Sequence, residues 1–160
     1  AAQTMYRAIR GSLLEKVHAI AAKEEERRSG YHGFLHANMN MFGQDDYIDY
    51  PRLVISTGSL QLPFGMKATR CTPEELELAW LDNSSTVTAQ PSDRLLVAAI
   101  FDTEPYQPEV LETNVFCRQN GQASVLLPEG EWETAHLYCF FSAENRKRFS
   151  PCMYFTVSKL

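Results

Sequence analysis

Residues 75–80 read Glu-Leu-Glu-Leu-Ala-Trp, and this stretch decides the fold. Leu76, Leu78 and Trp80 alternate with two glutamates and an alanine. Because successive side chains of a β-strand point to opposite faces, the three large apolar side chains share one face. The pattern predicts a strand with one wet and one buried face, and it places Trp80 in a core between two sheets.

Short apolar segments of the same kind recur after Pro51, separated by turn residues. Strands are predicted at residues 53–55, 66–71, 75–81, 95–101, 115–118, 122–127, 135–141 and 153–157. Seven or eight short strands at this spacing favour an antiparallel β-sandwich of the immunoglobulin-like kind. The chain is long enough to bury such a core without metal or disulfide support.

The predicted strand at 95–101 carries apolar residues on both faces, which indicates a central position with a cover on each side. For 95–101 the candidates are the second sheet on one face and the N-terminal helices on the other. We expect Val97, Tyr138 and Phe140 in the core. The aromatic set after residue 137 exceeds what one core face needs, so either both faces are covered or part of the set is an exposed binding patch. That set is Tyr138, Phe140, Phe141, Tyr154 and Phe155.

The pair Asn120-Gly121 is the strongest short hairpin signal in the chain. The favoured two-residue turn needs positive φ at both central residues, which asparagine and glycine tolerate best. The sequence therefore predicts a hairpin that joins antiparallel strands at 115–118 and 122–127.

Residues 1–46 are predicted to form a helical N-terminal segment, and residues 47–160 to form the sandwich. A helix is expected over 1–28, stopped by Ser29-Gly30, and a shorter one over 31–42, before an acidic linker at 43–49. The first helix carries one apolar stripe, formed by Tyr6, Ile9, Leu13, Val17 and Ile20. This stripe must be buried, and we expect it to form an interface with a neighbouring copy or partner; the alternative is docking on its own sandwich.

The formal net charge of −5 argues against a protein that binds nucleic acid, since such proteins usually present a basic face. The sequence has no apolar run of about eighteen residues, so no membrane-spanning segment is predicted. The compartment cannot be read from a leader sequence. The architecture leans towards an extracytoplasmic location, such as a cell surface, the extracellular space or a virion.

No cofactor, metal or catalytic residue is predicted. His32 and His36 have the four-residue helical spacing of a metal half-site, with Asp45, Asp46 and Asp49 as nearby oxygen donors, but no complete ligand set is evident. The four cysteines match no zinc pattern. They are expected to be small buried apolar residues, and the alternative is a disulfide between Cys139 and Cys152 across a hairpin.

Residues 62–157 resemble a fibronectin type III-like sandwich, through the core residue Trp80, the turn Leu127-Pro128 and the aromatic run at 136–143. More closely, the chain resembles a family of uncharacterised bacterial proteins with a domain of unknown function. The resemblance rests on Ile48-Asp49-Tyr50, residues 55–60 with Pro63, residues 79–83, Ser92-Asp93 and residues 138–143. It implies the sandwich fold and transfers no catalytic residue.

The sequence favours a non-enzymatic structural or binding module of a larger assembly, whose partner is another protein or further copies of itself. The alternative is an accessory domain that binds carbohydrate or protein through loops at one end of the sandwich, at residues 82–92 and 103–108. An assembly module is expected to leave its helical stripe or a sheet edge uncovered.

Overall fold

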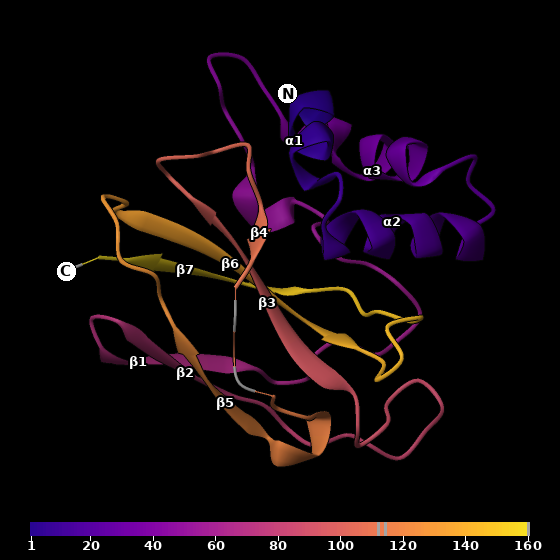
Figure 1. Ribbon diagram of the computed structural model, residues 1–160, viewed down its shortest axis with the longest axis vertical. Helices are drawn as coiled ribbons and strands as arrows, with labels where there is room; N and C mark the ends of the chain where they lie inside the picture. Colours follow the sequence, from indigo (N-terminus) through magenta and orange to yellow (C-terminus); the bar gives the residue numbers. More distant parts are fainter. Residues whose placement is uncertain (112, 114, 160) are drawn as a thin grey trace.

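The computed structural model describes residues 1–111, 113 and 115–159, and these form three layers (Figure 1). Three helices lie above a four-stranded sheet, and a three-stranded sheet lies below it. All the strand pairs are antiparallel. The predicted fold class, a fibronectin type III-like sandwich preceded by helices, is confirmed.

The strands are β1 Lys67–Thr72, β2 Glu75–Ala79, β3 Arg94–Phe101, β4 Glu109–Val110, β5 Gln122–Leu126, β6 Thr134–Ser142 and β7 Met153–Ser158. They are ordered β1-β2-β5 in one sheet and β4-β3-β6-β7 in the other. The strand predicted at 53–55 does not form. That segment is held under the helices by side chains: Asn38 accepts a hydrogen bond from the amide of Val54 at 2.7 Å and donates one to its carbonyl at 3.1 Å.

The helices are α1 Ala2–Ile9, α2 Leu13–Glu24 and α3 Gly30–Asn38, with 3-10 turns at Met39–Met41, Tyr50–Arg52 and Arg118–Asn120. The single helix predicted over 1–28 is wrong. Gly11 has a φ of +80°, outside the helical region, and Ser12 caps α2 by accepting a hydrogen bond from the amide of Leu14. The predicted second helix is shorter than expected, because it ends at Asn38.

The core between the two sheets contains Leu76, Leu78, Trp80 and Val97. The indole of Trp80 is 6% exposed, and its N–H donates to the carbonyl of Arg118 at 2.9 Å. Tyr138 and Phe140 are also fully buried, but they lie on the opposite face of β6 and pack against the helices. The four-stranded sheet therefore has a core on each face, as the double-sided pattern of 95–101 predicts.

The apolar stripe of the N-terminal helices contributes to this second core. Tyr6, Ile9 and Val17 are buried within their own chain, and Leu13 and Ile20 are partly buried beside them. The preference for a neighbouring copy as the cover of the stripe is therefore wrong. β3 and β6 carry apolar residues on their outer faces, which need a cover, and the stripe supplies it.

The hairpin predicted at Asn120-Gly121 is wrong. Asn120 ends a 3-10 turn, where its side chain accepts the amide of Cys117 at 2.6 Å, and Gly121 alone has positive φ, at +70°. The strand that follows, β5, pairs with β2 in the other sheet, while Cys117 forms a bridge to the start of β3. The turn thus carries the chain from one sheet to the other.

The four cysteines are free thiols, so the alternative of a Cys139–Cys152 disulfide does not hold. The expectation that all four are buried is also wrong, because Cys71 is exposed and only Cys139 is fully buried. Cys139 packs between the sheets, whereas Cys152, just before β7, packs on the helical side, so the two thiols lie on opposite faces of the sheet. Among the described residues, no helix combines the length and the apolar character needed to cross a bilayer.

Candidate functional site

A buried ionic cluster lies at the end of the sandwich where β3 begins. Arg118 is fully buried, and its Nε donates to the carboxylate of Asp93 at 3.0 Å. Its two terminal nitrogens donate to the side-chain oxygen of Asn83 at 2.9 Å and to the carbonyl of Gln61 at 2.7 Å. The guanidinium also lies 4.1 Å from the centre of the Phe141 ring. We call these five residues the Arg118 cluster.

The Arg118 cluster joins loops that are distant in the sequence. Asp93 is 1% exposed and also accepts the amide of Gln90, while the amide of Arg118 donates to the carbonyl of Asp93 at 2.7 Å. Burial lowers the pKa of Arg118, and Asp93 opposes that shift. Since the charges face each other and are sealed from water, the cluster fixes the loops and offers no group to a ligand.

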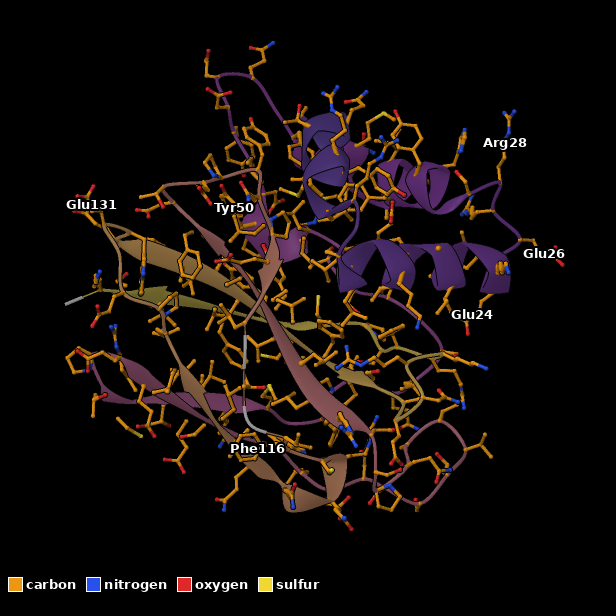
Figure 2. All side chains as sticks on the ribbon, in the orientation of Figure 1. Glu24, Glu26, Arg28, Tyr50, Phe116 and Glu131 are labelled. Atoms are coloured by element: carbon orange, nitrogen blue, oxygen red, sulfur yellow. The ribbon has the colours of Figure 1, made fainter. Side chains whose placement is uncertain are left out.

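An aromatic cluster occupies the other end of the sheet, on its helical side. It consists of Phe42, Tyr50, Tyr106, His136 and Tyr154, and each of these side chains is half-buried. They come from the loop after α3, the 3-10 turn at Tyr50–Arg52, the β3–β4 loop, and strands β6 and β7. Figure 2 shows Tyr50 on this side of the four-stranded sheet.

Stacking and hydrogen bonds fix the inner part of the aromatic cluster. The rings of Tyr50 and His136 are stacked with centres 3.7 Å apart and planes within 6°. A hydrogen bond of 2.6 Å joins Nδ1 of His136 to the hydroxyl of Tyr154. Below them, the hydroxyl of the buried Tyr138 donates to the carbonyl of Tyr50 at 2.7 Å. The inner rings are thus anchored to the rigid sheet.

The outer part of the aromatic cluster is more open. The rings of Phe42 and Tyr106 are stacked with centres 6.2 Å apart, and the hydroxyl of Tyr106 donates to Asp46 at 3.2 Å. Tyr47, in the same loop as Phe42, is 61% exposed. This part places aromatic surface and hydroxyl groups in contact with solvent.

Burial sets the protonation of the aromatic cluster. It lowers the pKa of His136, although the carboxylate of Asp102 opposes that shift. It raises the pKa of Tyr50 and of Tyr154. At neutral pH the cluster is therefore a neutral, polar aromatic surface, which is suited to contacts with a protein surface rather than to attracting an ion.

The structure does not assemble the metal half-site considered from the sequence. Nδ1 of His32 is 2.7 Å from the hydroxyl of Ser29, and His36 lies in a groove between α2 and α3. Within the described ranges, no three histidine, cysteine or acidic side chains form a group that could hold a metal ion. Of the acidic linker, Asp46 bonds to Tyr106 and Asp49 lies 3.5 Å from Arg52.

The loops at 82–92 and 103–108 do not form one surface. The first precedes β3 and the second follows it, so they lie at opposite ends of the sandwich (Figure 1). The alternative of a ligand surface built from both loops is therefore wrong. Of the aromatic set after residue 137, Tyr138, Phe140 and Phe141 are fully buried, and Tyr154 and Phe155 on β7 are partly exposed.

The sequence analysis missed Arg118 and the aromatic cluster. Arg118 appeared to end a strand, and no local pattern marks an arginine whose partners lie in other loops. Tyr50 and His136 appeared only within stretches that carried the family resemblance. Several of those stretches meet at the two clusters, since Trp80, Asn83 and Asp93 surround Arg118. The sequence signal for both clusters was therefore the set of stretches that carry the family resemblance, several of which come together in the fold.

A family model described as "Family of unknown function (DUF6266)" matches residues 39–156. The chain belongs to the DUF6266 family. The expected membership of an uncharacterised family is confirmed. The match begins just after α3 and ends within β7, so the Arg118 cluster and the aromatic cluster both lie inside the part shared with DUF6266.

The chain is also similar to solved fibronectin type III domains. The fn3 domain of human collagen alpha-1(XX) chain is 8% identical, with a TM-score of 0.43, over 63% of this chain and 86% of that one. The fn3 domain of human contactin 1 is 7% identical, with a TM-score of 0.40, over 65% and 81%. A structure described as a myokine is 10% identical, with a TM-score of 0.43, over 63% and 98%. No curated protein matches this member of DUF6266.

Proposed function

We propose that the protein is a non-enzymatic binding module of a larger assembly, and that it recognises another protein through the aromatic cluster. The observation that carries this proposal is the gathering of five half-buried aromatic side chains from separate segments onto one rigid sheet. Tyrosine and other aromatic residues are enriched at the centres of protein interfaces, where they supply large contact areas.

The anchoring of the inner rings supports binding rather than a purely structural role. The rings of Tyr50 and His136 are held by their mutual stacking and by the hydrogen bond between His136 and Tyr154 on β7, so little side-chain freedom is lost when a partner covers them. The rings remain half-exposed although the same sheet buries Tyr138 and Phe140 completely. An extracytoplasmic location stays a prediction.

The proposal is tested by site-specific photo-crosslinking in the source cells. A photoreactive phenylalanine replaces Tyr47, which is 61% exposed beside the aromatic cluster. The matched control replaces Leu126, which is 67% exposed on β5 in the other sheet. We expect one reproducible protein adduct from position 47 that is absent from position 126.

The adduct is identified by mass spectrometry, and it must disappear when Tyr50 is replaced by leucine in a chain that remains folded. Equal adducts from both positions would show that contacts are unspecific. No adduct from position 47, or an adduct that the Tyr50→Leu change leaves intact, would show that the aromatic cluster is not the binding surface.

A further inference from the structure

The outer edge of β7 carries backbone groups that bond to nothing in the described part of the chain. β7 ends the sheet order and pairs with β6 alone. The amide of Lys159 donates to the carbonyl of Glu133 at 2.7 Å, which places this position and every second one before it in hydrogen-bonded pairs with β6. The N–H and C=O groups of Tyr154 and Thr156 therefore point away from the sheet.

Two of the three other sheet edges have the features with which natural proteins block strand addition. β1 carries Lys67 and Arg70 and contains a register irregularity. β4 has two residues, one of them Glu109. β5, the third of these edges, is five residues long and also uncharged, and Phe116 lies beside it (Figure 2). A cavity there is lined by Glu77, Phe116 and residues 122–124.

β7 lacks these features. It is six residues long and reads Met-Tyr-Phe-Thr-Val-Ser, without charge or proline. Its side chains are partly or fully exposed except that of Val157. An uncharged, β-favouring edge of this length is a template for another strand.

We propose that β7 pairs with β7 of a second copy, antiparallel and centred on Phe155, so that the two four-stranded sheets become continuous. In this register Tyr154 of each copy lies opposite Thr156 of the other. The outward N–H and C=O of Tyr154 then bond to the outward C=O and N–H of that Thr156. Because the contact is two-fold symmetric, all four outward groups of each strand find partners at once.

The side chains favour the second copy as occupant. Phe155 lies opposite Phe155, and Met153 lies opposite Val157. Aromatic and β-branched cross-strand pairs of this kind stabilise antiparallel sheets. The chain carries a net charge of −5, but β7 contains no charged residue, so no like charges face each other across the proposed contact. The carbonyl of Ser158 already accepts a hydrogen bond from Arg70, which disfavours registers that shift the pairing towards the C-terminus.

The experiment measures the molar mass of the full chain by sedimentation equilibrium over a range of concentrations, together with amide hydrogen exchange. We expect a dimer, and protection of the Tyr154 and Thr156 amides that rises with concentration. Thr156→Pro removes an N–H that makes no bond inside the chain, so it should yield a folded monomer. The matched control Thr156→Val keeps the N–H and should remain dimeric.

A wild-type monomer at all concentrations, with rapid exchange at both amides, would overturn the proposal, as would a dimer that persists in Thr156→Pro. If the proline variant does not fold, Thr156→Lys decides in its place, because a lysine on an edge strand opposes pairing without removing a backbone group. The result is independent of the crosslink from position 47, so the edge pairing and the proposed function are tested separately.

Discussion

The Arg118 cluster and the aromatic cluster lie at opposite ends of strands β3 and β6, and they use polar groups in opposite ways. At one end, Arg118 is fully buried, and each of its three guanidinium nitrogens donates a hydrogen bond to another residue. At the other, tyrosines and a histidine are anchored from below but left half-exposed above. The comparison separates side chains that hold the sandwich together from side chains available to a partner.

The largest expected effect is at the closed end. Arg118→Ala leaves the carboxylate of Asp93 buried without its cation, and we expect a loss of about 3–5 kcal/mol in the free energy of unfolding. A loss of that size is a large fraction of the stability of an ordinary domain. Denaturant unfolding measures it directly.

The matched control is Arg148→Ala, because Arg148 is also an arginine in loop contacts but is only partly buried. Its effect should stay within about 0.5 kcal/mol. The double variant Arg118→Met with Asp93→Leu removes both charges and should recover part of the lost stability. A loss below about 1 kcal/mol for Arg118→Ala would show that the Arg118 cluster does not hold the sandwich together, and it would then not differ from the aromatic cluster in its effect on stability.

A second prediction concerns the buried histidine beneath the helices. The ring of His18 is 3% exposed, its Nε2–H donates to the carbonyl of Ile55 at 2.9 Å, and burial lowers its pKa to about 4. In the unfolded chain the pKa is about 6.5, so between these values the unfolded state binds more protons than the folded state. Stability is therefore full above about pH 6.5 and falls by about 3 kcal/mol as the pH drops to 4.

Urea unfolding at several pH values checks this dependence. His18→Gln keeps an N–H donor for Ile55 but cannot titrate, so its stability should change much less over the same window. His32→Gln, at an exposed histidine, should keep the wild-type dependence. Identical pH profiles for wild type and His18→Gln would show that other groups control acid stability.

Local patterns predicted what depends on neighbours in the sequence. The alternation of Leu76, Leu78 and Trp80 fixes both the strand and its inward face, since the pleat requires no information from elsewhere. The same reasoning failed at Asn120-Gly121. Turn residues specify a local dihedral, here the positive φ of Gly121, but not which strands pair.

The two clusters depend on tertiary structure and so escaped local patterns. The hydrogen-bond partners of the Arg118 side chain lie 25, 35 and 57 positions away, in the β2–β3 loop and in the loop before β1. Tyr50 reaches His136 only because residues 48–55 cross the sheet beneath the helices. Periodicity reports that a side chain is apolar and which face it shares, and it does not report which distant segment covers that face.

The smallest expected effect on stability is at the open end. Tyr50→Leu removes the stack on His136 and one weak hydroxyl contact with Pro105, yet it keeps the carbonyl that accepts the hydrogen bond from Tyr138. We expect a loss of about 1 kcal/mol in denaturant unfolding, the size of one aromatic pair. The same change should abolish the crosslink from position 47, so it separates folding from binding. A loss as large as that of Arg118→Ala would make Tyr50 a core residue, and the half-exposed rings would then be the rim of the helical core rather than a surface for a partner.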